Sequence, residues 1–195
     1  MLTWLKQRQD QRQKARSLYG SIVTQARSRG FYAEWGVPDT AEGRFEMIAL
    51  HLVLVLHRLA ATGTPGRRLG QALTEAFVAD LDDTLREMTV GDLAVPRHVK
   101  RAVAALHERH SAYRAALAAS SDGPLIAAIL AHLEGAGGSQ SLDAARLSGY
   151  IRRAKHRLDL LPAIEVLAGR VAWPQTDGPD ATCGRSLDDG VGYAR

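Results

Sequence analysis

The segment from Met47 to Leu56 constrains the fold more than any other part of the chain. Nine of its ten residues are apolar, and only His51 interrupts the run. A helix that is apolar almost all the way round has no face to present to water, so other helices must cover it. The run is also too short to cross a bilayer, which needs about 20 apolar residues. We therefore predict a buried central helix over residues 41–61.

The start and the end of this helix are marked by residues that favour helix boundaries. Asp39 follows Pro38 and is predicted to be the N-cap, because its carboxylate can accept hydrogen bonds from free backbone N–H groups. Glu42, three residues later, would complete a capping box. The turn at residues 63–66 is predicted to follow the end of the helix.

The rest of the chain shows helical stripes and no convincing strand alternation, so we predict an all-α fold. Apolar residues recur at three- and four-residue steps, which is typical of helices with one buried face. We expect a single domain of about six helices, with a basic N-terminal extension at 1–14, a helical domain at 15–173 and a disordered tail at 174–195. The core is expected within 19–120, and the other helices are predicted at residues 3–29, 69–88, 96–119, 124–133 and 142–161.

Charge is distributed unevenly along the chain. Residues 1–30 carry seven Lys and Arg against one Asp, residues 31–93 carry five basic against ten acidic residues, and residues 94–120 carry five against one. The basic N-terminal extension has two interpretations. It is either a solvated, frayed helix or an arm for an anionic surface, which could be lipid headgroups or RNA.

Three aromatic residues, Phe31, Tyr32 and Trp35, lie within five positions in a predicted loop over residues 31–39. They could be buried anchors that cover the end of the central helix. Alternatively, they could form an exposed patch that binds a partner.

The predicted helix at 69–88 carries acidic residues off its apolar stripe. Asp82 and Arg86 are spaced for a helical ion pair, whereas Asp83 and Glu87 at the same spacing repel each other. This ridge indicates either a basic partner or an internal arginine, or else a solvated face. The next helix has a basic face that could contact the acidic helix or an external anion.

The sequence contains no recognisable catalytic or metal-binding motif. His107 and His110 could share a metal, but no third ligand is apparent, and His51 is interpreted as a hydrogen-bonded core histidine. We therefore expect no catalytic residue, no metal and no cofactor. The single Cys183 cannot form an internal disulfide, and the N-terminus has no apolar stretch of signal-peptide length, so a cytoplasmic location is expected.

Several short motifs together resemble the ubiquinol-cytochrome c chaperone family, the bacterial relatives of the mitochondrial assembly factors for the cytochrome bc1 complex. The resemblance covers residues 19–117, with a weaker similarity at 167–171. The motifs are Phe31-Tyr32, Gly36-Val37-Pro38-Asp39, Gly43-Arg44-Phe45, His51-Leu52, Leu81-Asp82, Leu85-Arg86-Glu87-Met88 and Val90-Gly91-Asp92-Leu93.

The resemblance implies an all-helical, non-enzymatic chaperone that binds newly made cytochrome b and promotes assembly of the bc1 complex. It also implies contact with the ribosome, a small helical partner protein and peripheral contact with the cytoplasmic face of the inner membrane. Specific nucleic-acid binding is not expected. The partner-binding residues that we predict on or beside the client surface are Phe31, Tyr32, Trp35, Asp82, Asp83, Arg86, Glu87 and Asp92.

Two other functions stay open at the level of sequence. A helical enzyme or binding protein for a lipid or isoprenoid would need a large closed pocket containing Asp82 and Arg86. A nucleic-acid binder would use the basic helix that begins near Pro96, although its acidic neighbour and the lack of a known binding motif weaken this alternative.

Overall fold

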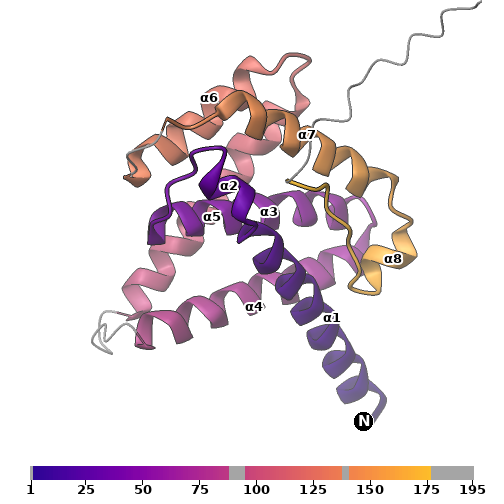
Figure 1. The fold of residues 1–195 in the computed structure, drawn as a ribbon. Coiled ribbons are helices and arrows are strands. Elements are labelled where there is room, and N and C mark those ends of the chain that lie inside the picture. The colour runs from indigo at the N-terminus through magenta and orange to yellow at the C-terminus, as the bar shows by residue number, and fades with distance from the viewer. Residues whose placement is uncertain (1, 88–94, 138–140, 177–195) are drawn as a thin grey trace, which may run out of the picture.

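The computed structural model describes residues 2–87, 95–137 and 141–176. Within these ranges all regular structure is helical, which confirms the all-α prediction (Figure 1). The helices are α1 (Leu2–Ala26), α2 (Arg29–Ala33), α3 (Ala41–Ala60), α4 (Thr64–Glu87), α5 (Val95–Ala118), α6 (Gly123–Leu133), the 3₁₀ helix η1 (Glu134–Ala136), α7 (Ala144–Leu160) and α8 (Ala163–Leu167).

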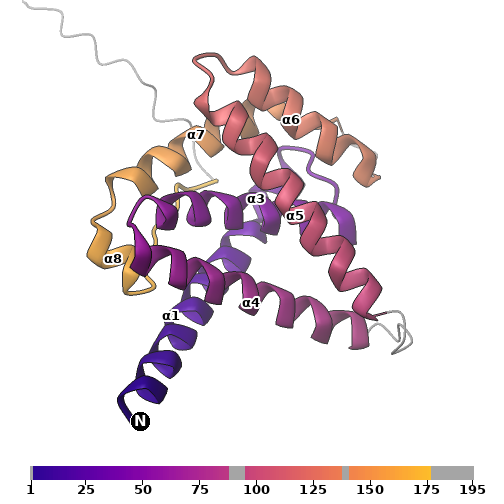
Figure 2. The ribbon, with the colours of Figure 1, turned by 180° about the vertical axis from the view of Figure 1, so that it is seen from behind.

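Helix α3 is the central helix, as predicted. Every residue from Met47 to Val55 except Ile48 is buried. Helices α1, α4, α5, α6 and α7 all contact it. Figures 1 and 2 show these helices on different sides of α3, so its apolar surface is covered in the way that the sequence requires. One cluster of buried side chains extends from Ala15 in α1 to Val166 in α8.

The N-cap of α3 is Thr40, and the prediction that Asp39 caps this helix is wrong. The Thr40 hydroxyl accepts a hydrogen bond from the Gly43 amide at 3.0 Å and donates one to the Ala136 carbonyl at 2.7 Å. Asp39 instead pairs with Arg44 at 2.7 Å on the surface. Thr40 is favoured because its hydroxyl can donate and accept at once, whereas a carboxylate can only accept.

The predicted first helix is divided into α1 and α2. α1 ends at Ala26, three residues before the predicted end, and α2 begins at Arg29, with Gly30 buried inside it. The break turns the chain so that Phe31 enters the core. The Tyr32 hydroxyl then donates to the Ala26 carbonyl at 2.7 Å, which satisfies an acceptor that the end of α1 leaves free.

Helix α4 begins at Thr64, five residues before the predicted start. Gly63 adopts a φ of 75°, the left-handed conformation that commonly follows a helix. Pro65 lies in the first turn of α4, where its missing N–H has no cost. The residues that were expected to form only a turn therefore also begin the next helix.

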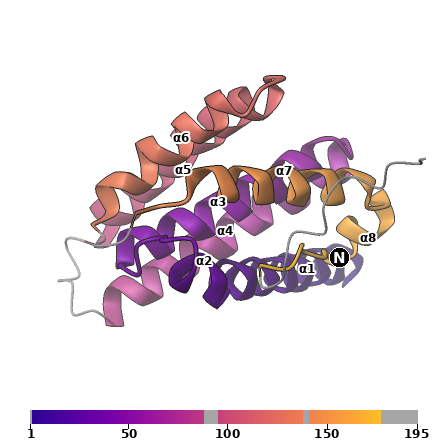
Figure 3. The same ribbon diagram turned by 45° about the horizontal axis from the view of Figure 1, so that its top comes forward.

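Helix α1 packs against α4, and its N-terminal end projects beyond the other helices (Figure 1). Figure 3 shows α7 beside α3, and Gly169, which follows α8, lies close to the Lys14 backbone in the middle of α1. Of the predicted tail, residues 174–176 are described, and Thr176 is buried. Residues 177–195, including Cys183, lie outside the described residues.

The glycines of this fold give a matched pair of stability predictions. A Cβ atom at Gly43 would lie 2.0 Å from the Pro38 carbonyl oxygen, whereas one at the exposed Gly20 in α1 would have no neighbour within 4 Å. Gly43→Ala should therefore lower the free energy of unfolding by about 1–3 kcal/mol, and Gly20→Ala should raise it by about 0.5–1 kcal/mol. Urea denaturation of both variants checks this, and equal effects would contradict the packing described.

Candidate functional site

Two of the three sequence-predicted aromatic residues lie in the core. Phe31 is 0 % exposed and Trp35 is 2 % exposed. The Tyr150 ring meets both of them edge to face, with centroid distances of 4.9 Å to Phe31 and 5.8 Å to Trp35. Tyr32 is half-buried against the end of α1. Phe31 and Trp35 are therefore buried anchors, and the interpretation that they form an exposed patch is wrong.

His51 is the centre of a polar network inside this aromatic cluster. Its Nδ1 lies 2.7 Å from the Met47 carbonyl oxygen, and its Nε2 lies 2.8 Å from the Tyr150 hydroxyl. Because a carbonyl can only accept, Nδ1 carries the proton and Nε2 accepts from Tyr150. The same hydroxyl accepts from the Gln25 amide at 3.0 Å. The network joins α1, α3 and α7.

The segment at residues 169–176 covers this network. The Trp173 ring lies edge to face on His51, with centroids 5.0 Å apart, and its Nε1 donates to the Ser21 hydroxyl at 3.0 Å. Gln25 also donates to the Pro174 carbonyl at 3.2 Å. His51 is consequently sealed from solvent, and this confirms its interpretation as a hydrogen-bonded core histidine.

Burial lowers the pKa of His51 from its ordinary value of 6.5 to about 4. The unfolded chain therefore takes up a proton near pH 6.5, while the folded chain resists it until about pH 4. Protonation favours the unfolded state throughout this window, so stability falls as the pH falls from 6.5 to 4.

The second buried polar pair is Glu46 in α3 with Arg109 in α5. The Arg109 Nε lies 2.6 Å from one Glu46 carboxylate oxygen and 2.9 Å from the other, and Nη2 makes a further contact. The side chains are only 6 % and 14 % exposed. The Arg109 guanidinium also lies 5.6 Å from the Phe45 ring centroid and donates to the Ala105 carbonyl. Arg109 is an internal arginine, but its carboxylate partner is Glu46 on α3, so this pair does not account for the acidic ridge on α4.

A groove of about 320 Å³ opens beside this pair, between the start of α3, the end of α4 and the first half of α5. We call it the α5 groove. Its wall combines small alanines with the Phe45 ring and basic side chains. The residues that line it are Ala41, Glu42, Phe45, Glu46, Leu81, His98, Arg101, Ala102, Ala105 and Arg109.

The sequence-predicted charged residues lie at the end of α4, next to the α5 groove. Asp82 directly follows Leu81, which lines the groove, and its carboxylate accepts from Arg86 at 2.8 Å. This confirms the predicted ion pair. Asp83 is exposed. Glu87 is the last residue of α4, and Asp92 lies outside the described residues.

A second groove of about 310 Å³ lies between the end of α3, the first half of α4 and the middle of α5. His107 and His110 line it, but no group of three potential metal ligands occurs in the described ranges. Burial, the largest cause, and the nearby Arg114 lower the pKa of His110. The geometry of this groove therefore provides no metal centre within the described residues.

We expect the His51 network to make stability pH-dependent. Between pH 6.5 and 4, His51 alone should lower the free energy of unfolding by about 3 kcal/mol, because one pKa unit corresponds to about 1.4 kcal/mol. His51→Asn should reduce the change of the free energy of unfolding with pH. Part of that change should remain, because burial also lowers the pKa values of His57 and His110. Denaturation at several pH values measures this. The exposed His156→Asn is the control, and an unchanged slope in His51→Asn would contradict the assignment.

We expect the Glu46–Arg109 pair to be strongly coupled. Glu46→Leu alone should lower the free energy of unfolding by about 3 kcal/mol, because it leaves a buried guanidinium without its carboxylate. The double change Glu46→Leu and Arg109→Met should recover much of this loss. A double-mutant cycle by urea denaturation measures the coupling. Additive losses in the double variant would contradict the coupling of Glu46 with Arg109. As a control, Asp39→Asn at an exposed position should change stability little.

Comparisons with known proteins place the chain in a family. Residues 33–173 match the family model described as ubiquinol-cytochrome C chaperone. The crystal structure of the Cbp3 homolog from Brucella abortus is similar, with 31 % sequence identity, a TM-score of 0.79, and coverage of 92 % of this chain and 100 % of that one. A search of curated proteins finds no match. The match spans well over half of the sequence, so the chain belongs to the ubiquinol-cytochrome c chaperone family.

Proposed function

We propose that this chain, as an assembly chaperone for the bc1 complex, binds newly made cytochrome b. The observation that carries the proposal is the family match over residues 33–173, which include α3 to α8. Membership in a chaperone family makes the protein a non-enzymatic assembly factor. Such a protein needs a binding surface for its client more than a catalytic site.

We assign the client surface to the α5 groove together with the acidic end of α4. The groove offers apolar walls and a phenyl ring, which suit an apolar segment. Asp82 and Asp83 flank it with negative charge. Because cytoplasmic loops of membrane proteins carry an excess of Lys and Arg, an acidic margin beside an apolar groove complements such a client.

Asp82 pairs with Arg86 on the same helix, but Asp83 near the end of α4 is not explained by helix stability. Negative charge near the C-terminus of a helix opposes the helix macrodipole. Asp83 is exposed, and the Asp82 side chain is 35 % exposed. The placement of Asp83 is therefore better explained by contact with a cationic partner.

The alternative functions receive less support from the geometry. Asp82 and Arg86 lie on the exposed face of α4, with side chains 35 % and 49 % exposed, whereas a lipid or isoprenoid enzyme would need them inside a closed pocket. On the basic α5 helix, Arg109 turns inward to Glu46 and so is not available to a nucleic acid.

The remaining partners implied by the resemblance stay predictions. They are a ribosome contact and a small helical partner protein. Among the described residues no helix is both long and apolar enough to cross a membrane. We propose peripheral contact with the cytoplasmic face of the inner membrane, where a cytochrome b client would be inserted.

Crosslinking in cells that are making the bc1 complex tests the client surface. Tagged chain should capture unassembled cytochrome b. The Asp82→Lys and Asp83→Lys double variant should lose most of this capture, because it repels cationic loops, while its helical content by circular dichroism stays unchanged. Ala102→Trp should also reduce capture by filling the α5 groove.

Ala104 provides a matched control for the groove. It is exposed on the same helix and does not line the groove. Ala104→Trp should therefore retain capture. Absence of cytochrome b from the wild-type crosslinks would contradict the proposed client, and equal capture by all variants would contradict the proposed surface.

A further inference from the structure

We propose that one edge of the molecule docks on an anionic lipid bilayer, with Leu160 and Ile164 entering the headgroup region. This basic edge consists of the N-terminal half of α1, the start of α4, and the corner between α7 and α8. The inference deepens the proposed function by naming the surface that would contact the membrane. It is drawn from exposure and charge at a part of the molecule distant from the α5 groove.

Leu160 and Ile164 are exposed to an unusual degree. Leu160 at the end of α7 is 70 % exposed, and Ile164 in α8 is 74 % exposed. Among the large hydrophobic residues that the structure describes, the only other exposed one is Val103, at 37 %. The pair lies on either side of Pro162, where the chain turns at the outer edge of the molecule (Figure 2).

The shape of this corner fits a bilayer better than a protein partner. A stable protein interface buries about 800 Å² on each side, whereas two side chains on a turn offer a small protrusion. A bilayer accepts such a protrusion, because apolar groups of peripheral proteins enter its headgroup and acyl boundary by about 5–10 Å.

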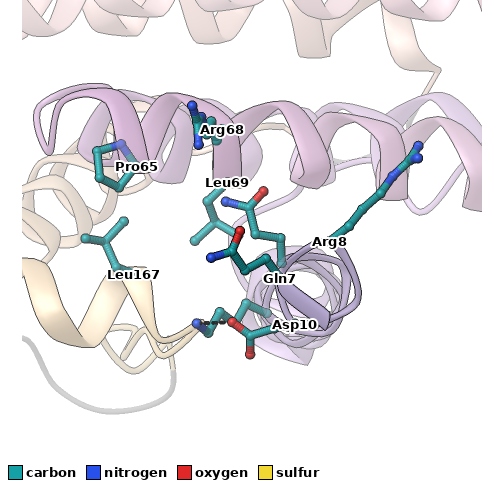
Figure 4. A pocket seen from close by; sticks show the side chains of 9 residues that line it. Gln7, Arg8, Asp10, Pro65, Arg68, Leu69 and Leu167 are labelled. Atoms are coloured by element: carbon teal, nitrogen blue, oxygen red, sulfur yellow. Dashed lines mark hydrogen bonds and ion pairs between the residues drawn. The ribbon is translucent and has the colours of Figure 1, made fainter. Parts of the chain in front are cut away.

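Helix α8 is held against α1 and α4, so the corner has a fixed place beside the basic residues. A Cβ at Gly169, whose φ is 82°, would lie 2.9 Å from the Lys14 carbonyl oxygen. The chain after α8 therefore contacts the backbone of α1 closely. Leu167 of α8 also faces Pro65 of α4 across a cleft of about 710 Å³ (Figure 4). Arg68 and Leu69 from α4 complete this side of the cleft.

The edge beside the corner carries a large excess of positive charge. Residues 6–16 of α1 contain five Lys and Arg against the single Asp10, and Arg68 of α4 lines the same cleft as Arg8. Asp10 pairs with Lys14 at 2.5 Å. The acidic residues nearest the corner are also paired, Asp159 with Lys155 and Glu165 with Arg170.

These cations complement anionic headgroups and are not explained by helix stability. Arg68 lies near the N-terminal end of α4, where the helix macrodipole disfavours positive charge. The opposite end of α4 carries Asp82 and Asp83. An anionic membrane would attract the basic N-terminal end of α4 and repel its acidic C-terminal end. The protein would therefore dock with the basic edge toward the lipid and the α5 groove away from it.

Flotation of the full chain with lipid vesicles tests this inference. It should bind phosphatidylcholine vesicles that contain phosphatidylglycerol, bind pure phosphatidylcholine weakly, and dissociate as salt is raised. The Leu160→Ser and Ile164→Ser double variant should bind the anionic vesicles at least about tenfold more weakly, because two aliphatic side chains no longer enter the lipid. Val103→Ser, the other exposed aliphatic position, should bind as wild type.

Charge variants test the second half of the inference. Arg12→Glu with Arg68→Glu should also weaken vesicle binding at low salt. The matched control is Arg97→Glu with Lys100→Glu on α5, which makes the same change in net charge away from the basic edge. An equal loss of vesicle binding in the two double variants would overturn the proposed edge.

The remaining outcomes separate the lipid surface from the client surface. Absence of binding to anionic vesicles at low salt would overturn the membrane inference and leave the cytochrome b proposal standing if capture persists. Normal vesicle binding by the Leu160 and Ile164 variant, combined with loss of cytochrome b capture, would assign the corner to a protein contact. Normal vesicle binding by the wild type without cytochrome b capture would overturn the client proposal alone.

Discussion

The structure depends on satisfying the polar side chains of a helix that is buried almost all round. Glu46 and His51 lie in α3 among apolar residues, and water reaches neither of them freely. A buried polar group without a partner is costly, so each must receive a hydrogen-bonding group from another helix. Arg109 of α5 pairs with Glu46, and Tyr150 of α7 bonds to His51. These two contacts fix where α5 and α7 cross α3.

The same contacts shape both proposed surfaces. Because Arg109 holds α5 against the start of α3, the small residues before it leave an open groove rather than a closed core. Because α7 packs along α3 and the 169–176 segment returns over His51, α8 is brought back to the start of α4. The buried helix α3 thus lies between two surfaces. One is the α5 groove with the acidic end of α4, and the other is the basic edge with its exposed apolar corner.

Sequence patterns predicted what depends on local periodicity and missed what depends on tertiary partners. The apolar run identified α3 as central, and short motifs identified the family. Thr40 displaced Asp39 as N-cap because the carbonyl of Ala136, far along the chain, needs a donor. The Glu46–Arg109 pair joins positions 63 residues apart, so no local spacing indicates it. Ile164 was not identified as a surface residue because the sequence analysis predicted no helix at residues 163–167, where α8 lies.

The central claim is that the end of α4 and the first half of α5 form the client surface. Hydrogen exchange of the chain alone and in complex with unassembled cytochrome b measures this most directly, since it reports every backbone amide. The account predicts slower exchange on binding at residues 79–87 and 97–105, with little change in the buried part of α3. Protection confined to other helices, or none in a complex that forms, would contradict it.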